Sequence, residues 1–360
     1  AAFGIAGNLL VSATGNLLAF NGTIGKTLSV IGNITNDGTI DLSKTGSILN
    51  LIGTSAQTIN GSGTLTNGSI GRLVFNNTAT VPTINWNWLN TVVSGTLTMT
   101  SGRINLGSTN KMTLGTALTT GNNGTLTYTS GGFLNGTFSR WWTNGGTGSA
   151  TSAGTDPTTA TSRYPFINAS GINRAAYIER TTPTAGGQYS IKYTDAATTS
   201  ASSIVDGTYT VQTVFDGSWV VGTEGTTPAA ASHALVLLAP GSYVAANGNS
   251  RIVGASAILG GTHRNGTATP GAQRTGLTLA ELTSGPAYIG ANTADILAPC
   301  SGAPTAGTAA ASSTSICSAT NFSLTLTGST TGVTGITYQW QSSPDGTTWT
   351  NIASATSTLA

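Results

Sequence analysis

Apolar and small polar residues alternate along the first third of the chain, and a glycine stands before most restarts of the pattern. Each restart reads as glycine, a polar residue, and then Leu or Ile. Alternation places one side chain in a core and the next in solvent, while glycine permits a sharp corner between strands. Such units bury their apolar side only by stacking on neighbouring copies, which predicts a β-solenoid. The restarts lie at Gly15, Gly22, Gly32, Gly38, Gly46, Gly63, Gly95, Gly102 and Gly124.

The repeat region covers residues 1–138, and we interpret it as a parallel β-helix. Roughly six or seven coils of about 20 residues would use this length. Asn-Gly and Asp-Gly pairs, which mark tight hairpins, do not recur at a regular spacing here, so antiparallel pairing is not expected. The first coil, residues 1 to about 15, has no charged or helical cap. We therefore expect upstream chain or a neighbouring copy in a head-to-tail contact to cover it.

The residue pattern changes at Arg140-Trp141-Trp142, where a second segment, residues 139–297, begins. This segment holds most of the ionisable residues. Its strand patterns are short, regular and separated by Asp-Gly and Gly-Gly turns, which favours an antiparallel β-sandwich. The clearest patterns are Ala176–Arg180, Gln188–Tyr193, Thr208–Phe215 and Ser218–Val221.

The remaining chain divides into an extended linker at residues 298–315 and an incomplete immunoglobulin-like domain at residues 316–360. Tyr338-Gln-Trp340 has the placement of the core Trp of such a domain, so we expect Trp340 to be buried and Trp349 partly buried. The whole chain is therefore predicted to be all-β. Cys300 and Cys317 enclose a short loop that a disulfide could close, although the sequence does not fix their partners.

Charged residues make up only 7% of the chain, against roughly 25% in ordinary soluble proteins. Solubility then rests on Thr, Ser, Asn and Gly, a composition typical of exported bacterial surface proteins. The net charge of +2 is not clustered, so no nucleic-acid partner is expected. The longest apolar run, Ala234–Ala239, is too short to span a bilayer. We expect an extracellular protein, at the cell surface or secreted, with no membrane span in this chain.

Catalytic chemistry finds little support in the sequence. A polysaccharide-cleaving β-helix needs clustered carboxylates, yet only Asp37 and Asp41 precede residue 150. We interpret them as a turn residue and a surface strand residue. His233 and His263, the two histidines of the chain, lack further metal ligands at a suitable spacing. We predict that the protein is not an enzyme and has no catalytic, cofactor-binding or metal site.

The segment Tyr338–Ile352, preceded by Cys300 and Cys317, resembles the immunoglobulin-like repeats of large Bacteroidetes cell-surface proteins. Those proteins are similar to ones exported by the type IX secretion system and tethered by a C-terminal sorting domain. In that family further cysteines follow later in the chain. The resemblance therefore implies that Cys300 and Cys317 either pair with each other or each pair with one of those later cysteines. The N-terminal parts of the same proteins resemble this chain at Ser94–Gly107, Ser139–Trp142, Tyr164–Phe166 and Asn173–Arg180.

Aromatic residues are the remaining candidates for contact with a partner. We interpret Trp86 and Trp88 as an exposed or edge pair on one strand face, because residues two apart point the same way. Together with Trp141 and Trp142 they are possible contacts to a glycan or a protein partner. The function that this sequence favours is an extracellular structural or adhesive protein with a rigid β-rich stalk. A subunit of an extracellular filament, or a carbohydrate-binding or -degrading β-helix, stays open as an alternative.

Overall fold

The computed structural model divides the chain into two compact units, residues 1–295 and 296–360, which are described separately. It describes residues 2–17, 26–79, 84–148, 162–196, 198–215, 217–239, 249–264 and 271–295 of the first unit and, in the second, residues 296, 298–299, 305, 307–313, 315, 323–330, 333–334 and 338–352. The structure is all-β, with one four-residue helix among these residues. No described helix is long and apolar enough to cross a membrane.

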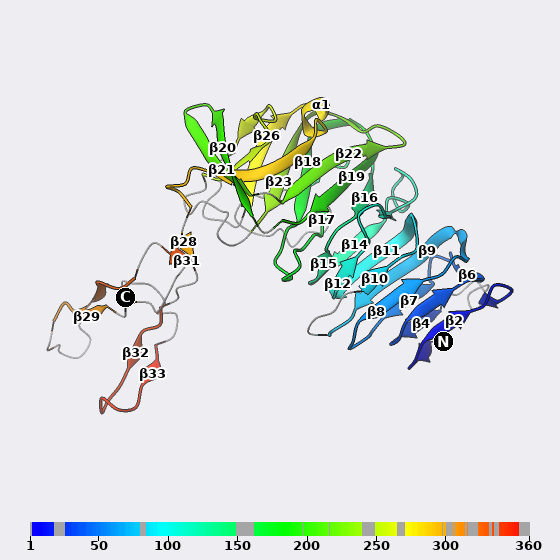
Figure 1. Cartoon of the computed structure of the whole chain (residues 1–360), viewed down its shortest axis with the longest axis horizontal. Helices are drawn as coiled ribbons and strands as arrows, with labels where there is room; N and C mark the ends of the chain where they lie inside the picture. The colour runs from blue at the N-terminus through cyan, green and yellow to red at the C-terminus, as the bar shows by residue number, and fades with distance from the viewer. Residues whose placement is uncertain are drawn as a thin grey trace. The chain divides into compact units, whose positions relative to one another are not determined.

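The first unit begins as a β-solenoid of about 5 turns, in which three stacks of parallel strands surround a core (Figure 1). The first stack is β1 (Ala2–Ile5), β4 (Thr27–Val30), β7 (Ile48–Leu51), the later parts of β9 (Thr64–Asn76) and β11 (Thr91–Ser101), and β14 (Thr125–Tyr128). The second is β2 (Leu9–Val11), β5 (Ile34–Asn36), β8 (Gln57–Asn60), β10 (Ile84–Trp86), β12 (Arg103–Asn105) and β15 (Gly132–Phe133). The third is β3 (Asn16–Leu17), β6 (Thr39–Leu42), the early parts of β9 and β11, β13 (Lys111–Leu114) and β16 (Thr137–Trp142).

The parallel solenoid predicted from the alternating pattern is confirmed, but the predicted coil number is too high. Strands of successive coils stack in register, and the Asn33 amide donates a hydrogen bond to Asn8 Oδ1, 25 residues earlier. The Thr58 amide repeats this bond to Asn33 Oδ1, again across 25 residues. Most coils are thus longer than the predicted 20 residues, so fewer of them fit the same length.

The alternation that predicted the solenoid is seen in the burial of its strands, although β1 in the first coil has no buried side chain. In β4, Leu28 and Val30 are buried, whereas Thr27 and Ser29 are half-buried. The glycine restarts also stack on one another: a Cβ at Gly63 would lie 2.3 Å from the carbonyl oxygen of Gly38. Any side chain at this corner would separate the coils, which explains why glycine recurs there.

The solenoid sheet continues without a break into an antiparallel part. β16 has β13 as its parallel neighbour on one edge and β19 as its antiparallel neighbour on the other. Beyond it follow β19 (Gly187–Thr194), β22 (Ser218–Glu224), β27 (Pro286–Ala291), β21 (Tyr209–Phe215) and β20 (Thr199–Asp206), with β24 (Arg251–Val253) also paired to β27. The predicted antiparallel strands are present, and they belong to the same compact unit as the solenoid.

A second antiparallel sheet packs against this extension. It consists of β17 (Arg163–Tyr164), β18 (Ala176–Ala185), β23 (Ala229–Leu238), β26 (Gly271–Leu277) and β25 (Thr262–His263). The Tyr189 ring of one sheet meets the His233 ring of the other edge to face, with centroids 5.9 Å apart. The short helix α1 (Leu279–Leu282) follows β26 and is closed by a capping box between Thr278 and Glu281.

In the second unit, three two-stranded pairs are described. They are β28 (Ala298–Pro299) with β31 (Val333–Thr334), β29 (Thr308–Ala311) with β30 (Leu324–Thr327), and β32 (Gln341–Ser342) with β33 (Thr350–Asn351). The segment interpreted as a linker therefore contains the strand β29. Trp340 is half-buried and Trp349 is 58% exposed, so the predicted burial of both side chains is wrong for the described hairpin.

Candidate functional site

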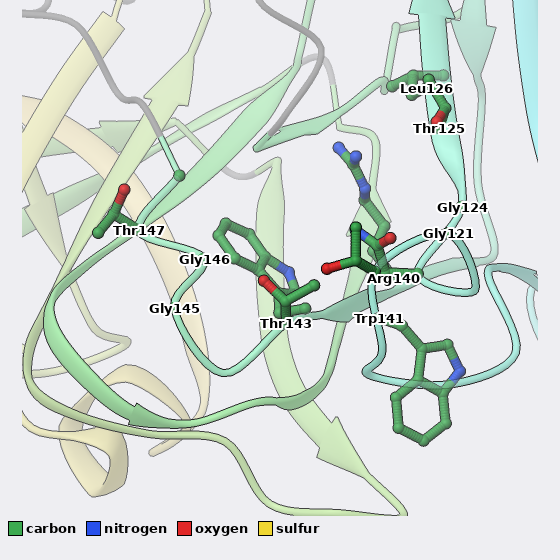
Figure 2. Close-up of a pocket in the computed structure, with 14 residues that line it drawn as sticks. Gly121, Gly124, Thr125, Leu126, Arg140, Trp141, Thr143, Gly145, Gly146 and Thr147 are labelled. Carbon is green, nitrogen blue, oxygen red and sulfur yellow. The ribbon is translucent and has the colours of Figure 1, made fainter.

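A cavity of about 550 Å³ opens beside the end of β16, where the solenoid passes into the antiparallel sheets (Figure 2). Parallel neighbours β13 and β16 run in the same direction, so the segments that follow them leave the same edge of the sheet. Residues 120–126 form one wall, residues 143–148 form the other, and Arg140 to Trp142 lie between them. The volume falls within the range of pockets that hold small molecules, about 300–1,000 Å³.

The first wall belongs to the loop between β13 and β14. This loop closes on itself, because the Thr116 amide donates to the Asn122 carbonyl at 2.7 Å and the Asn122 side chain donates to Thr119 Oγ1 at 2.9 Å. Gly124, with φ of +70°, then turns the chain into β14. A left-handed backbone of this kind favours glycine, so this position of the wall has no side chain.

The second wall is held by a buried arginine. Arg180 donates from Nη2 to the Thr143 carbonyl, from Nε to the Gly146 carbonyl and from Nη1 to the Ala185 carbonyl, each at 2.7 Å. Its guanidinium also lies 5.3 Å from the ring centre of Trp142, a cation–π contact. Burial lowers the pKa of Arg180. The planar fork fixes carbonyls on both sides of the turn, so this wall is preorganised.

Arg140 and Trp142 form the buried floor between the walls, and each is 5% exposed. Arg140 Nη1 donates to the Arg163 carbonyl at 2.8 Å, and Trp142 Nε1 donates to the Tyr164 hydroxyl at 3.3 Å. Burial lowers the pKa of Arg140 to about 10, so the guanidinium stays charged at neutral pH. It is the one charged group among the residues that line the described cavity.

Trp141 lies on the opposite side of β16, and its indole points away from Arg140 (Figure 2). Its ring is half-buried, so of the two lining tryptophans Trp141 keeps an accessible face. Trp141 pairs with Gln188 of β19, which in turn pairs with Glu224. Glu224 forms a half-exposed ion pair with Lys111 at 2.5 Å.

The exposure predicted for Trp86 and Trp88 is wrong, because the core encloses both rings. Trp86 is fully buried and Trp88 is 6% exposed, and the two rings meet edge to face with centroids 5.4 Å apart. Their indole N–H groups donate to Thr91 Oγ1 at 2.9 Å and to the Asn60 carbonyl at 2.8 Å. Asn87 between them is exposed, so the expected placement of both rings on one side holds, but that side faces the core.

Of the other residues singled out in the sequence, Asp37 and Asp41 accept hydrogen bonds within turns and between coils. Asp37 accepts from the Ser62 amide at 3.1 Å, and Asp41 accepts from the Ser43 amide at 3.0 Å. Cys300 and Cys317 lie outside the described residues. Within the described ranges, no group of three His, Cys, Asp or Glu side chains is placed to hold a metal ion.

The sequence did not reveal the cavity, the buried arginines or their partners. Arg180 is 1% exposed and Arg274 is fully buried. Arg274 forms an ion pair with Asp206 at 2.9 Å, inside the unit. A usable signal was strand alternation, which places Arg140 on the strand face of Phe138 and Trp142, and Arg180 on that of Ile178.

Comparison with known proteins gives one match. Residues 305–359 match a family described as a domain of unknown function, DUF8696. No curated protein and no solved structure matches the chain. The matched segment belongs to the second unit, whereas the cavity belongs to the first. The chain is thus similar to the DUF8696 family over its C-terminal part.

Proposed function

We propose that this chain is a structural and adhesive protein of the cell exterior, which presents a rigid β-rich stalk to glycans, surfaces or other subunits. The observation that carries the proposal is the shared sheet of the solenoid and the antiparallel part. β16 belongs to both, and it pairs with β19 from Thr137↔Lys192 through Trp142↔Gly187. A hinge at this point would have to break the pairing of adjacent strands.

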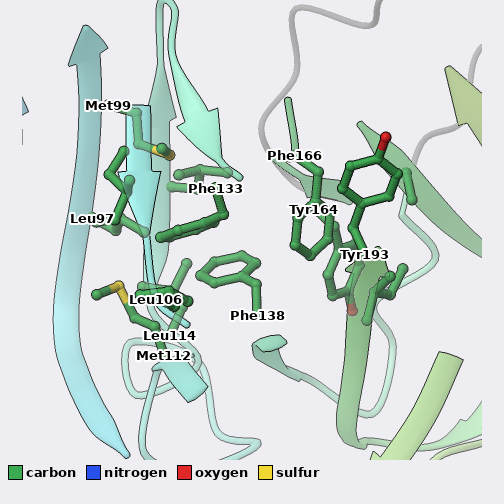
Figure 3. Packing of buried hydrophobic residues seen from close by; sticks show 14 of the residues in the cluster. Leu97, Met99, Leu106, Met112, Leu114, Phe133, Phe138, Tyr164, Phe166 and Tyr193 are labelled. Carbon is green, nitrogen blue, oxygen red and sulfur yellow. The ribbon is translucent and has the colours of Figure 1, made fainter. Parts of the chain in front are cut away.

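The core at the junction supports the same proposal. Phe133, from the last coil, stacks on Phe138 with centroids 5.1 Å apart, and Phe138 meets Tyr164 of the second sheet at 6.0 Å (Figure 3). Phe133 also meets Phe166 edge to face at 6.3 Å. One cluster of buried side chains runs through this junction from the first coils into both sheets. Bending would expose these rings, so the junction is suited to transmitting force.

The outer surface of the solenoid supports an adhesive role. Thr35 Oγ1 donates to Asn60 Oδ1 at 2.8 Å, and Asn105 Nδ2 donates to Asn85 Oδ1 at 3.1 Å, which forms short polar ladders across the coils. The whole chain is only 7% charged. Such a surface offers hydrogen-bond donors and acceptors without strong charge, and it matches hydroxyl-rich partners better than ionic ones. Carbohydrate binding is the second candidate, favoured by the cavity beside β16.

Two measurements on the purified full chain test the proposal. Electron microscopy of single particles should show residues 1–295 as one unbent body, and a population bent at β16 would contradict the stalk. Beads coated with the chain should adhere to glycan-coated surfaces above the level of albumin-coated beads. Equal retention of the two kinds of bead would contradict the adhesive role.

A further inference from the structure

We propose that the cavity beside β16 binds a sugar ring of a neutral glycan, with Trp141 as its stacking surface. The class of partner, a glycan, is taken from the proposed adhesive function. The assignment adds the site at which the glycan would bind. The site comprises the loop before β14, the turn after β16 and the exposed side of Trp141.

The chemistry of the lining favours a hydroxyl-rich ligand. Thr120, Thr125 and Thr147 are exposed at the rim, where their hydroxyls both donate and accept hydrogen bonds. Glycines occupy much of both walls, so no bulky side chain covers these hydroxyls. Sugar hydroxyls need donors and acceptors at short intervals, and this lining supplies them without a long flexible side chain.

Other classes of ligand fit the lining less well. A lipid chain requires an apolar cavity, but beside the two tryptophans the lining contains one larger aliphatic residue, Leu126. A nucleotide or a polyanion requires several cations, whereas Arg140 is the one cation among the described lining residues. A protein segment would bury a wide apolar patch, which this hydroxyl-bearing and glycine-rich lining does not offer. An uncharged ligand with many hydroxyls remains the best match.

Trp141 supplies the apolar part of the contact. Its ring is half-buried, so it is held by the sheet yet keeps a face toward solvent. The turn at Gly225, with φ of +56°, brings the backbone beside the ring, and a Cβ there would lie 3.9 Å from the Trp141 ring. A rigid indole loses little conformational entropy on binding, and the apolar C–H face of a pyranose can cover it. Because the walls are already held in place before binding, less conformational entropy is lost when the ligand binds.

The test measures binding of the full chain to defined oligosaccharides. A glycan array first selects the best neutral oligosaccharide, and titration calorimetry then measures its affinity. Trp141→Ala should weaken binding about tenfold or more, as expected for a tryptophan at the centre of a contact. Thr125→Val, which removes a rim hydroxyl at nearly constant volume, should weaken it several-fold. Matched controls are Trp349→Ala, which removes an exposed Trp from the other unit, and Thr98→Val, on the neighbouring strand outside the cavity.

The outcomes separate the cavity from the adhesive function. Circular dichroism checks that each variant folds. Unchanged affinity in both Trp141→Ala and Thr125→Val would overturn the cavity assignment, even if coated beads still adhered. Binding of oligogalacturonate alone would overturn the neutral class. Sugar binding that depends on Trp141, without bead adhesion, would support the cavity while contradicting the adhesive function. Absence of binding to any arrayed glycan would overturn the assignment.

Discussion

Replacement of Arg180 by Met is the sharpest test of how the cavity wall is built. The guanidinium donates to carbonyls of Thr143, Gly146 and Ala185, each at 2.7 Å, and it is 1% exposed. Met keeps much of the side-chain volume and its contact with Trp142, but it removes every donor. The substitution therefore isolates the hydrogen bonds from the packing.

The size of the effect follows from the carbonyls that lose their donor. A buried group left without its partner costs about 1–3 kcal/mol, and relaxation of the exposed turn recovers part of this, so we expect a loss of about 3–4 kcal/mol in the free energy of unfolding. Arg180→Lys retains the charge but has a single ammonium that cannot reach all of the carbonyls. It should lose about 2 kcal/mol, between wild type and Arg180→Met.

Urea denaturation of the full chain, followed by tryptophan fluorescence, measures these differences. Hydrogen exchange adds a local readout, because the Gly146 amide donates to the Thr143 carbonyl at 3.1 Å and should exchange faster in Arg180→Met. Lys192→Met, which removes an exposed cation from β19, is the control and should change the unfolding free energy by less than about 0.5 kcal/mol. If Arg180→Met stays within about 1 kcal/mol of wild type, with Gly146 exchange unchanged, then the arginine does not hold the wall.

Further predictions concern the junction, the coil corners and the response to pH. Phe138→Ala should lower the free energy of unfolding by about 3–5 kcal/mol in the same urea assay, because the ring is fully buried between the last coil and the second sheet. A loss below about 1 kcal/mol would contradict the continuous core. Gly61→Ala should lower the melting temperature, since φ is +112° and the new Cβ would lie 2.0 Å from the Asn36 carbonyl oxygen, whereas Gly4→Ala, with open space around it, should not. Burial lowers the pKa of His233 below its ordinary 6.5, so the folded chain keeps it neutral while the unfolded chain binds a proton. Stability should therefore fall as the pH drops below about 6.5, and less so in His233→Gln; parallel pH profiles of the two proteins would refute this role.

The solenoid was readable from the sequence because its pattern is local and repeated. Alternation in β4 places Leu28 and Val30 in the core that successive coils share. Gly38 and Gly63 recur because successive coils are in close contact at that corner. The coil number was not readable, since loop lengths between strands vary without changing the pattern. The two-residue rule correctly put Trp86 and Trp88 on one side of the chain, but alternation alone does not say which side faces the core.

The partners of the buried arginines could not be found from sequence, although strand alternation places Arg140 and Arg180 on inward-facing sides. The partners of Arg180 are backbone carbonyls of Thr143, Gly146 and Ala185, and backbone carbonyls carry no residue-type signal. Arg140 likewise binds the carbonyl of Arg163, which is contributed by the other sheet. Only the folded arrangement brings these acceptors together.

The position of the cavity follows from the change of strand direction at β16. Parallel strands release their following loops at the same edge, so the loops after β13 and β16 must lie next to each other. β19 runs the opposite way and begins at that edge with Gly187, which pairs with Trp142 and adds no bulky side chain. The turn that enters β19 packs against Trp142 and Thr143 through Gly186, which has no side chain, so it leaves space between the two outgoing loops. A sequence boundary at residue 138 hid this arrangement, because it cut β16 into two predicted domains although β16 is the strand that joins them.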